Sequence, residues 1–280
     1  MQNYSILSLA KNGFSNHKNW GKAWKNPLLK DEYDVIIIGA GGHGLATAYY
    51  LAKDFGVTNV AVLERGWLGG GNVARNTVTV RSNYMRDQSV PFYVKSVELY
   101  EGLTKNLNFN MMHSKRTMID VVLNYPKMRE LRRRQLVMDI YGSTYEQITT
   151  QRVRELIPAL TGGGPNSRLP IIGGMVHEDA GVNRHDAVAW GYARAADALG
   201  VEMHEQTGVL SVTRKPDGSV SGVETIKGKV KAKKVVVAVS GHTTTLTETV
   251  GLKLPLRTMN LTAFVSEPVK PLVDVIVNCS

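Results

Sequence analysis

The chain has 280 residues, 43% hydrophobic and 21% charged, a balance that is ordinary for a globular protein and excludes the disordered and fibrous classes. Its formal net charge of +10 suits nucleic-acid binding, but the basic residues gather in three clusters, none of which is interleaved with stacking aromatics in a nucleic-acid-binding pattern. We therefore predict solvated faces or subunit contacts and no nucleic-acid site. The one cysteine, Cys279, excludes an internal disulfide, and the seven histidines lack metal-ligand spacing, so we predict no metal site.

Residues 1–32 predict a polar N-terminal arm that contains Trp20, Trp24 and Pro27 and has no sustained periodicity. One basic cluster, residues 18–30, lies in this arm; the other two clusters are residues 129–134 and 227–234. The arm lacks the apolar core and cleavage site of a secretory signal, and no apolar run in the chain is long enough to cross a bilayer. We therefore expect a cytoplasmic protein without membrane contact.

A strand, a helix and a second strand follow the arm. Residues 33–38 form a β-branched run typical of a strand that is buried on both faces. Residues 45–54 predict a helix, because Leu45, Ala48 and Ala52 share one face, and residues 60–63 form another buried strand. A unit of this length predicts parallel strands joined by a right-handed crossover.

The turn between the first strand and the helix reads Gly39-Ala40-Gly41-Gly42-His43-Gly44, which fits the pattern G-x-G-x-x-G. Gly39 permits a tight turn, Gly41 lets the backbone approach a pyrophosphate, and Gly44 lets the helix pack on the strand. The positive N-terminal end of the helix, including Gly42 and the backbone of His43, would face the phosphates. The pattern therefore predicts a dinucleotide site.

Glu64 closes the second strand, where its carboxylate can accept hydrogen bonds from a ribose diol. A ribose 2′-phosphate would be repelled there, which disfavours NADP. The alternative interpretation is a glycine turn in an ordinary α/β protein, with Glu64 on the surface.

Further elements continue this alternation of helices and strands. Helices are predicted at residues 91–107, 125–140, 151–160 and 185–199, and strands at residues 171–177, 209–213, 220–226, 235–239 and 262–266. The turn signal Pro216-Asp217-Gly218 joins two of these strands into a hairpin. We predict an α/β fold in which excursions from a parallel sheet build a second, antiparallel sheet, while strands from residue 209 onward return to the first.

Residues 64–76 resemble the second glycine-rich segment of the D-amino-acid-oxidase-like flavoenzymes. By this resemblance, polar contacts to the flavin diphosphate come from Asn72, Arg75, Asn76 and Thr77. Residues 235–242 resemble the strand and turn beneath FAD, and Gly208-Val209 matches the place where the backbone, at Val209, meets the adenine. The resemblance therefore implies FAD instead of NAD.

Several segments are more specifically similar to the beta-subunit family of heterotetrameric sarcosine oxidases: residues 42–52, 59–64, 66–68, 81–84 and 184–196. The resemblance covers essentially the whole chain. In this family the beta subunit binds FAD noncovalently and carries FMN attached covalently to a histidine. The position that matches this histidine is His185.

The resemblance also implies a domain organisation: a glutathione-reductase-type, Rossmann-like FAD-binding sheet with an interleaved antiparallel substrate domain. After the arm at residues 1–32, we expect the FAD-binding domain at 33–80 and 180–260, and a partial substrate and FMN-side domain at 81–179 and 261–280. Family members continue beyond the position of Ser280, so we expect the fold to be incomplete.

The expected start of a helix lies at His185. The positive helix end disfavours imidazolium and keeps a ring nitrogen available as a nucleophile, whereas Asp186 opposes this effect. A neutral imidazole nitrogen could attack the 8α carbon of a flavin. Without the family, His185 would be interpreted as an ordinary helix-start or solvated histidine.

The resemblance implies that the complete enzyme oxidises sarcosine to glycine, forms hydrogen peroxide and transfers one carbon to tetrahydrofolate. It implies alpha, gamma and delta subunits as partners. The sequence assigns no catalytic residue, and we expect the 280 residues alone to be inactive.

Three alternatives remain open at this point. One is a single-subunit FAD amine or amino-acid dehydrogenase in which His185 is a spectator. The second is a noncatalytic FAD-binding subunit. The weakest is an NAD-dependent dehydrogenase, which a yellow protein that releases FAD on denaturation would exclude.

Overall fold

The computed structural model describes residues 5–18 and 21–279, so parts of the predicted arm, residues 1–4 and 19–20, and Ser280 lie outside the described residues. The chain forms two compact units. Unit 1 comprises Met1–Asn76, Leu107–Phe109 and His185–Ala263. Unit 2 comprises Thr77–Asn106, Asn110–Arg184 and Phe264–Ser280.

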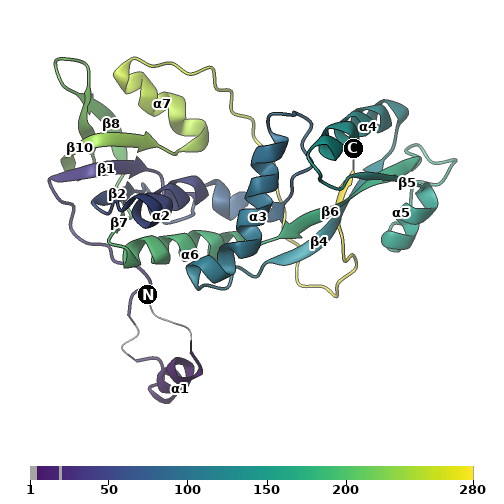
Figure 1. Ribbon diagram of the computed structural model, residues 1–280, viewed down its shortest axis with the longest axis horizontal. Helices are drawn as coiled ribbons and strands as arrows, with labels where there is room; N and C mark the ends of the chain where they lie inside the picture. Colours follow the sequence, from purple (N-terminus) through teal and green to yellow (C-terminus); the bar gives the residue numbers. More distant parts are fainter. Residues whose placement is uncertain (1–4, 19–20, 280) are drawn as a thin grey trace. The chain divides into compact units, whose positions relative to one another are not determined.

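Unit 1 is built on a six-stranded sheet with the order β7-β2-β1-β10-β9-β8 (Figure 1). Its strands are β1 (Glu32–Ile38), β2 (Val60–Leu63), β7 (Glu202–His204), β8 (Val209–Arg214), β9 (Val220–Thr225) and β10 (Gly228–Val237). β1 pairs in parallel with β2 and β10, and β2 pairs in parallel with β7. The predicted parallel strand–helix–strand unit is confirmed.

The outer half of this sheet is antiparallel. β9 pairs antiparallel with both β8 and β10, and the predicted hairpin turn is closed by the N–H of Lys215 donating to the carbonyl of Ser219 at 2.8 Å. The strands β8, β9 and β10 therefore return to the first sheet, as predicted for strands from residue 209 onward, whereas the later β11 joins the second sheet.

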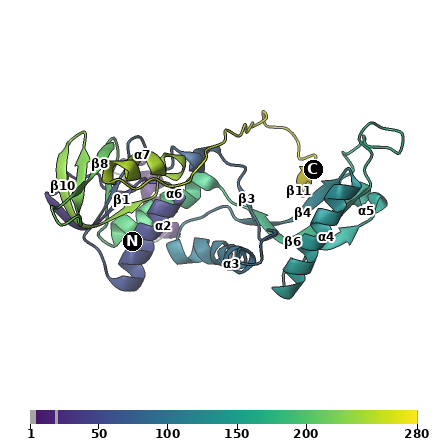
Figure 2. The ribbon, with the colours of Figure 1, turned by 90° about the horizontal axis from the view of Figure 1, so that it is seen from above.

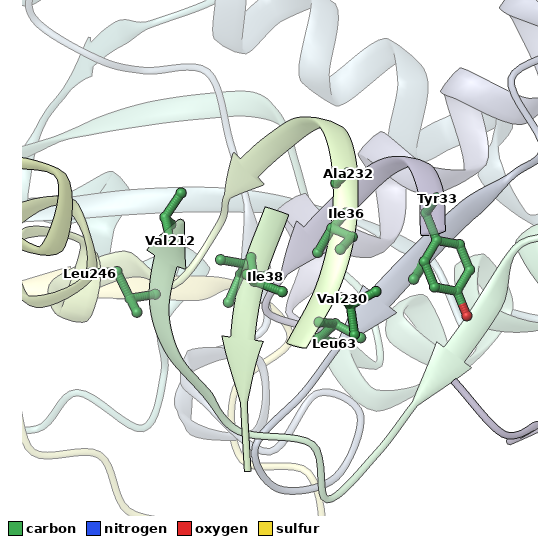
Figure 3. Close-up of a cluster of buried hydrophobic side chains, with 10 residues drawn as sticks. Tyr33, Ile36, Ile38, Leu63, Val212, Val230, Ala232 and Leu246 are labelled. Atoms are coloured by element: carbon green, nitrogen blue, oxygen red, sulfur yellow. The ribbon is translucent and has the colours of Figure 1, made fainter. Parts of the chain in front are cut away.

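Helices α2 (Gly42–Phe55) and α6 (His185–Ala198) lie side by side in unit 1 (Figure 1). The remaining helical segments of this unit are α1 (Ile6–Phe14), η1 (Asn72–Arg75), η2 (Ser240–His242), α7 (Thr243–Thr247) and η3 (Glu248–Val250). Figure 3 shows the apolar cluster in which Ile36, Ile38 and Leu63 of the central strands meet Val230 of β10 and Leu246 of α7. Burial of these side chains supplies most of the stabilisation of the sheet.

Unit 2 contains the second sheet, in the order β11-β4-β6-β3, with β5 paired to β6 (Figure 2). The elements are β3 (Thr79–Val80), α3 (Val90–Leu107), β4 (Ser114–Val122), α4 (Tyr125–Ile140), β5 (Glu146–Ile148), α5 (Thr150–Leu156), β6 (Gly173–Val182) and β11 (Ile276–Cys279). All pairs with β6 are antiparallel, and β11 joins β4 in parallel. The mixed α/β fold class is thus confirmed.

Three features differ from the sequence predictions. The predicted strand at residues 262–266 is wrong: Phe264 and Val265 are 90% and 97% exposed, and no described strand pairs with this segment. The arm is not wholly irregular, because α1 begins where the Ser5 hydroxyl accepts from the N–H of Ser8. β4 was not predicted, although it forms the centre of the second sheet.

A buried histidine in unit 2 gives that unit a pH-dependent stability. His177 is 0% exposed, and its Nδ1 lies 2.7 Å from the carbonyl oxygen of Thr144, while Nε2 lies 3.4 Å from the N–H of Ser82. A neutral ring that donates from Nδ1 and accepts at Nε2 satisfies both neighbours. Burial lowers the pKa of His177.

Because the folded pKa of His177 is depressed, the unfolded chain binds more protons below about pH 6.5. We expect unit 2 to lose stability as the pH falls from about 7 towards the lowered pKa, with a slope of up to about 1.4 kcal/mol per pH unit from this group. His177→Gln should remove that part of the slope. The stability of unit 2 at each pH is measured by the hydrogen-exchange protection of β4 and β6, corrected for intrinsic exchange rates. Equal slopes of stability against pH in the wild type and in His177→Gln would contradict the assignment of this pH dependence to His177.

Candidate functional site

The glycine turn after β1 is held by close backbone packing at two positions. Gly39 has φ +104°, and a Cβ there would lie 2.5 Å from the carbonyl oxygen of Ala238. A Cβ on Gly44 would overlap the carbonyl oxygen of Gly39 and lie 3.4 Å from Cγ2 of Ile37. Both positions therefore require glycine for the strand, the turn and helix α2 to approach one another.

The two glycines between them are open. A Cβ on Gly41 or Gly42 would meet only Cγ2 of Val73, at 4.0 Å and 3.7 Å. Gly41 caps α2 without a side-chain hydrogen bond, and His43, two residues later, is exposed. The first-turn N–H groups of α2 thus lack a side-chain acceptor and form a positive surface that fits a diphosphate.

Glu64 is fixed beside this turn at the end of β2. Its Oε2 accepts from the N–H of Ala40 at 3.0 Å, and its Oε1 accepts from the N–H of Gly66 at 2.9 Å. Each carboxylate oxygen keeps a second acceptor position, and the residue is only half-buried. The carboxylate can therefore accept hydroxyl groups of a ribose without losing its backbone partners.

The segment before β8 lies against the same strand end. The N–H of Thr207 donates to the carbonyl of Glu64 at 2.7 Å, and the N–H of Gln206 donates to the carbonyl of Gly66 at 3.0 Å. The first residue of β8 is Val209, which is half-buried. The structure thus brings Val209 and Glu64, which are far apart in sequence, to neighbouring segments.

The second glycine-rich loop joins the first. The N–H of Gly69 donates to the carbonyl of Ala40 at 2.9 Å, and Nδ2 of Asn72 donates to Oγ of Ser240 at 2.9 Å. The glycine turn, η1 and the turn after β10 therefore converge at the carboxyl ends of the parallel strands. Ligands of open α/β sheets bind at such an edge.

Of the other polar residues that were predicted to contact the flavin diphosphate, Arg75 and Asn76 donate hydrogen bonds to carbonyls of their own loop. Arg75 donates to the carbonyls of Gly70 and Gly71, and Asn76 donates to the carbonyl of Val73 at 2.7 Å. Thr77 is exposed and is the first residue of unit 2. Arg75 and Asn76 therefore brace the loop in this conformation, and Asn72 reaches the turn after β10.

His185 is the first residue of α6, as predicted. Its Nδ1 is buried and has no hydrogen-bond partner in the part of the chain that the structure describes. Oδ1 of Asp186 accepts from the N–H of Ala187 at 2.8 Å and so occupies part of the helix end. Nearby on α6, Cβ of Ala189 is 3.3 Å from where a Cβ on Gly69 would lie. Among the described residues, no hydrogen bond joins His185 itself to the glycine turn.

Sequence reasoning missed a cavity of about 290 Å³ in unit 2. It is lined by Arg81, Asn83, Tyr84, Met85, Arg86, Ser89, Tyr93 and Arg134. The rings of Tyr84 and Tyr93 stack at 3.7 Å, and the guanidinium of Arg81 lies 4.6 Å from the centre of the Tyr84 ring. Burial raises the pKa of Tyr84.

Two arginines of this cavity are held by the same residue. Arg81 donates to Oδ1 of Asn83 at 2.6 Å, and Arg134 donates to the carbonyl of Asn83 at 3.2 Å. Nε of Arg134 is buried without a partner among the described residues. The cavity therefore offers fixed cations to an anionic ligand.

In the described ranges, no three His, Cys, Asp or Glu side chains are grouped in a way that could hold a metal ion. The helices of those ranges include none that is both long and apolar enough to span a bilayer.

The fold is similar to solved flavoenzymes. L-proline dehydrogenase from P. horikoshii superimposes with a TM-score of 0.77 over 90% of this chain and 65% of that protein, at 20% sequence identity. This similarity concerns the fold alone.

Similarity in sequence is greater. The chain is 44% identical over 99% of its length to the sarcosine oxidase subunit beta of Rhodobacter capsulatus, and 45% identical over 98% to that of Rhizobium meliloti. It spans about two thirds of these relatives, 66% and 65% of their lengths. The model of the DAO family, described as FAD dependent oxidoreductase, matches residues 34–278. The chain therefore belongs to the DAO family of FAD dependent oxidoreductases.

Proposed function

We propose that the chain is the beta subunit of a heterotetrameric sarcosine oxidase, which oxidatively demethylates sarcosine to glycine with formation of hydrogen peroxide and transfer of one carbon to tetrahydrofolate. Its partners in this proposal are alpha, gamma and delta subunits. The observation that carries the proposal is the 44–45% identity, over nearly the whole chain, to proteins named sarcosine oxidase subunit beta.

FAD is proposed to bind noncovalently at the carboxyl edge of the unit 1 sheet. The backbone of Gly39, Gly41, Gly42, His43 and Gly44 would face the diphosphate, because the N–H groups of the first α2 turn are uncapped there. Glu64 would accept from the ribose and Val209 would offer its backbone to the adenine. Asn72, Arg75, Asn76 and Thr77 complete the proposed set. When bound, FAD supplies the acceptor for the two electrons removed from the amine.

His185 is proposed to carry FMN covalently. The proposal is supported by the buried Nδ1 of His185, which has no hydrogen-bond partner among the described residues and so is not engaged by another group. In the neutral ring, one nitrogen would supply the lone pair for attachment. When attached, FMN supplies a second redox centre, at which oxygen can be reduced.

The arginine cavity of unit 2 is proposed to bind the carboxylate of the substrate. Sarcosine is an amino acid, and its carboxylate needs a cation that is held in place, while its amine must stay free to react. Arg81 and Arg134 supply guanidinium groups fixed by Asn83, with the stacked Tyr84 and Tyr93 beside them. A planar guanidinium suits bidentate binding of a carboxylate.

The attachment proposal predicts that His185→Ala removes all flavin that stays with the protein after acid precipitation. Noncovalent FAD should change less than about twofold, because no glycine-turn contact involves His185. His242→Ala is the matched control, since His242 is exposed and should leave acid-stable flavin unchanged. The variants are purified with the alpha, gamma and delta subunits, and flavin is measured in pellet and supernatant. Acid-stable flavin in His185→Ala would contradict the role.

The proposed reaction is tested by sarcosine-dependent peroxide formation in the co-purified complex. We expect turnover in the wild type. Two results together would favour a single-subunit FAD dehydrogenase: acid releases all the flavin, and the chain oxidises another amine without the other subunits. A flavin-loaded complex that is silent towards sarcosine would favour a noncatalytic subunit.

A further inference from the structure

Helix α4 presents an unpartnered outer surface. The helix buries Met128, Leu131 and Met138 against unit 2. Among the exposed residues on its opposite side, six lie at spacings of three and four, which places them on one face, and the exposed Asp139 lies at the edge of this face. We name this set the outer α4 face: Tyr125, Arg129, Arg132, Arg133, Leu136 and Ile140.

The cations of this face are not neutralised within the described chain. Glu130 pairs with the inner cations of the same helix, Lys127 at 3.1 Å and Arg134 at 3.3 Å. Arg132 donates to the neutral Oε1 of Gln147 at 2.8 Å. No described carboxylate lies within ion-pair distance of Arg129 or Arg133. Like charges three and four residues apart repel one another, so a ligand that brings carboxylates stabilises this face.

The same face is apolar at its C-terminal half. Leu136 and Ile140 are 65% and 75% exposed, one turn apart. Beside the arginines, a hollow of about 460 Å³ is lined by Pro126, Arg129, Glu130, Arg132 and Arg133. The arginines and the hollow that they line therefore lie in the N-terminal part of α4, and the aliphatic pair follows them towards the C-terminus.

We propose that the outer α4 face docks an acidic amphipathic segment of a partner subunit. Its carboxylates would pair with Arg129, Arg132 and Arg133, and its apolar side chains would cover Leu136 and Ile140. A nucleic acid could use the arginines but not the aliphatic half, and the face offers only Tyr125 for stacking on bases. The identity of the partner as a subunit rests on the proposed function.

The test reverses the charge of the face in the triple variant Arg129→Glu, Arg132→Glu and Arg133→Glu, co-expressed with the alpha, gamma and delta subunits. A control variant reverses three exposed cations elsewhere: Arg168→Glu, Lys253→Glu and Lys270→Glu. Both variants have the same net charge. We expect the first to raise the dissociation constant of the complex at least 100-fold and the control to change it less than threefold, as measured by native mass spectrometry on a dilution series.

The second variant, Leu136→Ser with Ile140→Ser, keeps every charge and should also weaken assembly, about tenfold or more. FAD content checks the folding of unit 1, where all the proposed FAD residues except Thr77 lie, and none of them is altered. Hydrogen exchange of β4 and β6 checks the folding of unit 2, which contains α4. Assembly of the triple variant with wild-type affinity would overturn the docking proposal and leave the proposed function standing. Failure of the wild type to assemble with these subunits would overturn both. Binding of a labelled RNA 20-mer that depends on the three arginines, with assembly unchanged, would overturn the docking proposal in favour of nucleic acid.

Discussion

Gly44→Ala is expected to destabilise unit 1 severely and to abolish FAD binding. The added Cβ would overlap the carbonyl oxygen of Gly39, which belongs to the turn and cannot move unless β1 and α2 separate. Ile37 crowds the same point from the strand. Overpacking costs about 1–3 kcal/mol where side chains can adjust, and more where backbone must shift. We therefore expect a loss above about 3 kcal/mol, a large part of the stability of an ordinary domain.

Gly41→Ala is the matched comparison. Gly41 has φ −80°, which alanine adopts readily, and the new Cβ would meet only Val73 at 4.0 Å. Its effect on unfolding should stay within about 0.5 kcal/mol, as for ordinary surface changes. FAD affinity should nevertheless fall at least 100-fold, because the methyl group takes the place that we propose for the diphosphate.

Urea unfolding followed by tryptophan fluorescence separates the two effects. Trp24, Trp67 and Trp190 belong to unit 1, and the sequence of unit 2 contains no tryptophan, so the signal reports unit 1. FAD binding is measured by quenching of flavin fluorescence. A normal unfolding midpoint for Gly44→Ala would refute the close approach of helix and strand. Wild-type FAD affinity for Gly41→Ala would refute the placement of the diphosphate.

The parts of the fold that could be predicted have signals within a few neighbouring residues. β2 is a continuous apolar run and β1 ends in one, and α4 and α6 begin at the residues that the periodicity indicated. β4 was not predicted, because its first residues are polar and Asp120 lies in its most buried part. Its burial comes from β6 and β11, which lie far away in the sequence.

The same distinction applies to the candidate site. The glycine turn and Glu64 are 20 to 25 residues apart in a standard unit, so the spacing alone indicated their proximity. The arginine cavity joins residues near 81 and 134 through a carbonyl of Asn83, which no local pattern reveals. Arg75 has a local signal, and its partners among the described residues are carbonyls of its own loop, which the sequence pattern did not indicate.

The second large effect is expected at Asp120. This residue is 1% exposed, and its Oδ2 accepts from the hydroxyl of Tyr145 at 2.6 Å and from Nδ2 of Asn83 at 3.3 Å, while Oδ1 accepts from Nδ2 of Asn278. Burial, with the adjacent carboxylate, raises the pKa of Tyr145, so its hydroxyl stays protonated and donates. Asn83 in turn holds Arg81. Asp120 therefore accepts hydrogen bonds in the core of unit 2 and, through Asn83, helps to hold Arg81 in the arginine cavity.

Asp120→Ala removes the acceptor of two buried donors, on Tyr145 and Asn83, and of the exposed Asn278, and we expect it to destabilise unit 2 by about 3–5 kcal/mol. Tyr145→Phe removes one donor and should cost about 1–2 kcal/mol. Asp139→Ala, at an exposed position of α4, is the control and should stay within about 0.5 kcal/mol. Because unit 2 has no tryptophan, hydrogen exchange of β4 and β6 is the measurement.

The double variant of Asp120→Ala with Tyr145→Phe distinguishes a hydrogen-bonded network from simple loss of packing. If the carboxylate acts by accepting the phenol, the double variant costs less than the sum of the single variants, because the second change removes a donor that is already unsatisfied. Additive costs would show that Tyr145 and Asp120 act independently. In that case the hydrogen bond between Arg81 and Asn83 would not depend on the hydroxyl of Tyr145. The geometry of the cavity would then depend on backbone contacts such as the hydrogen bond from Arg134 to the Asn83 carbonyl.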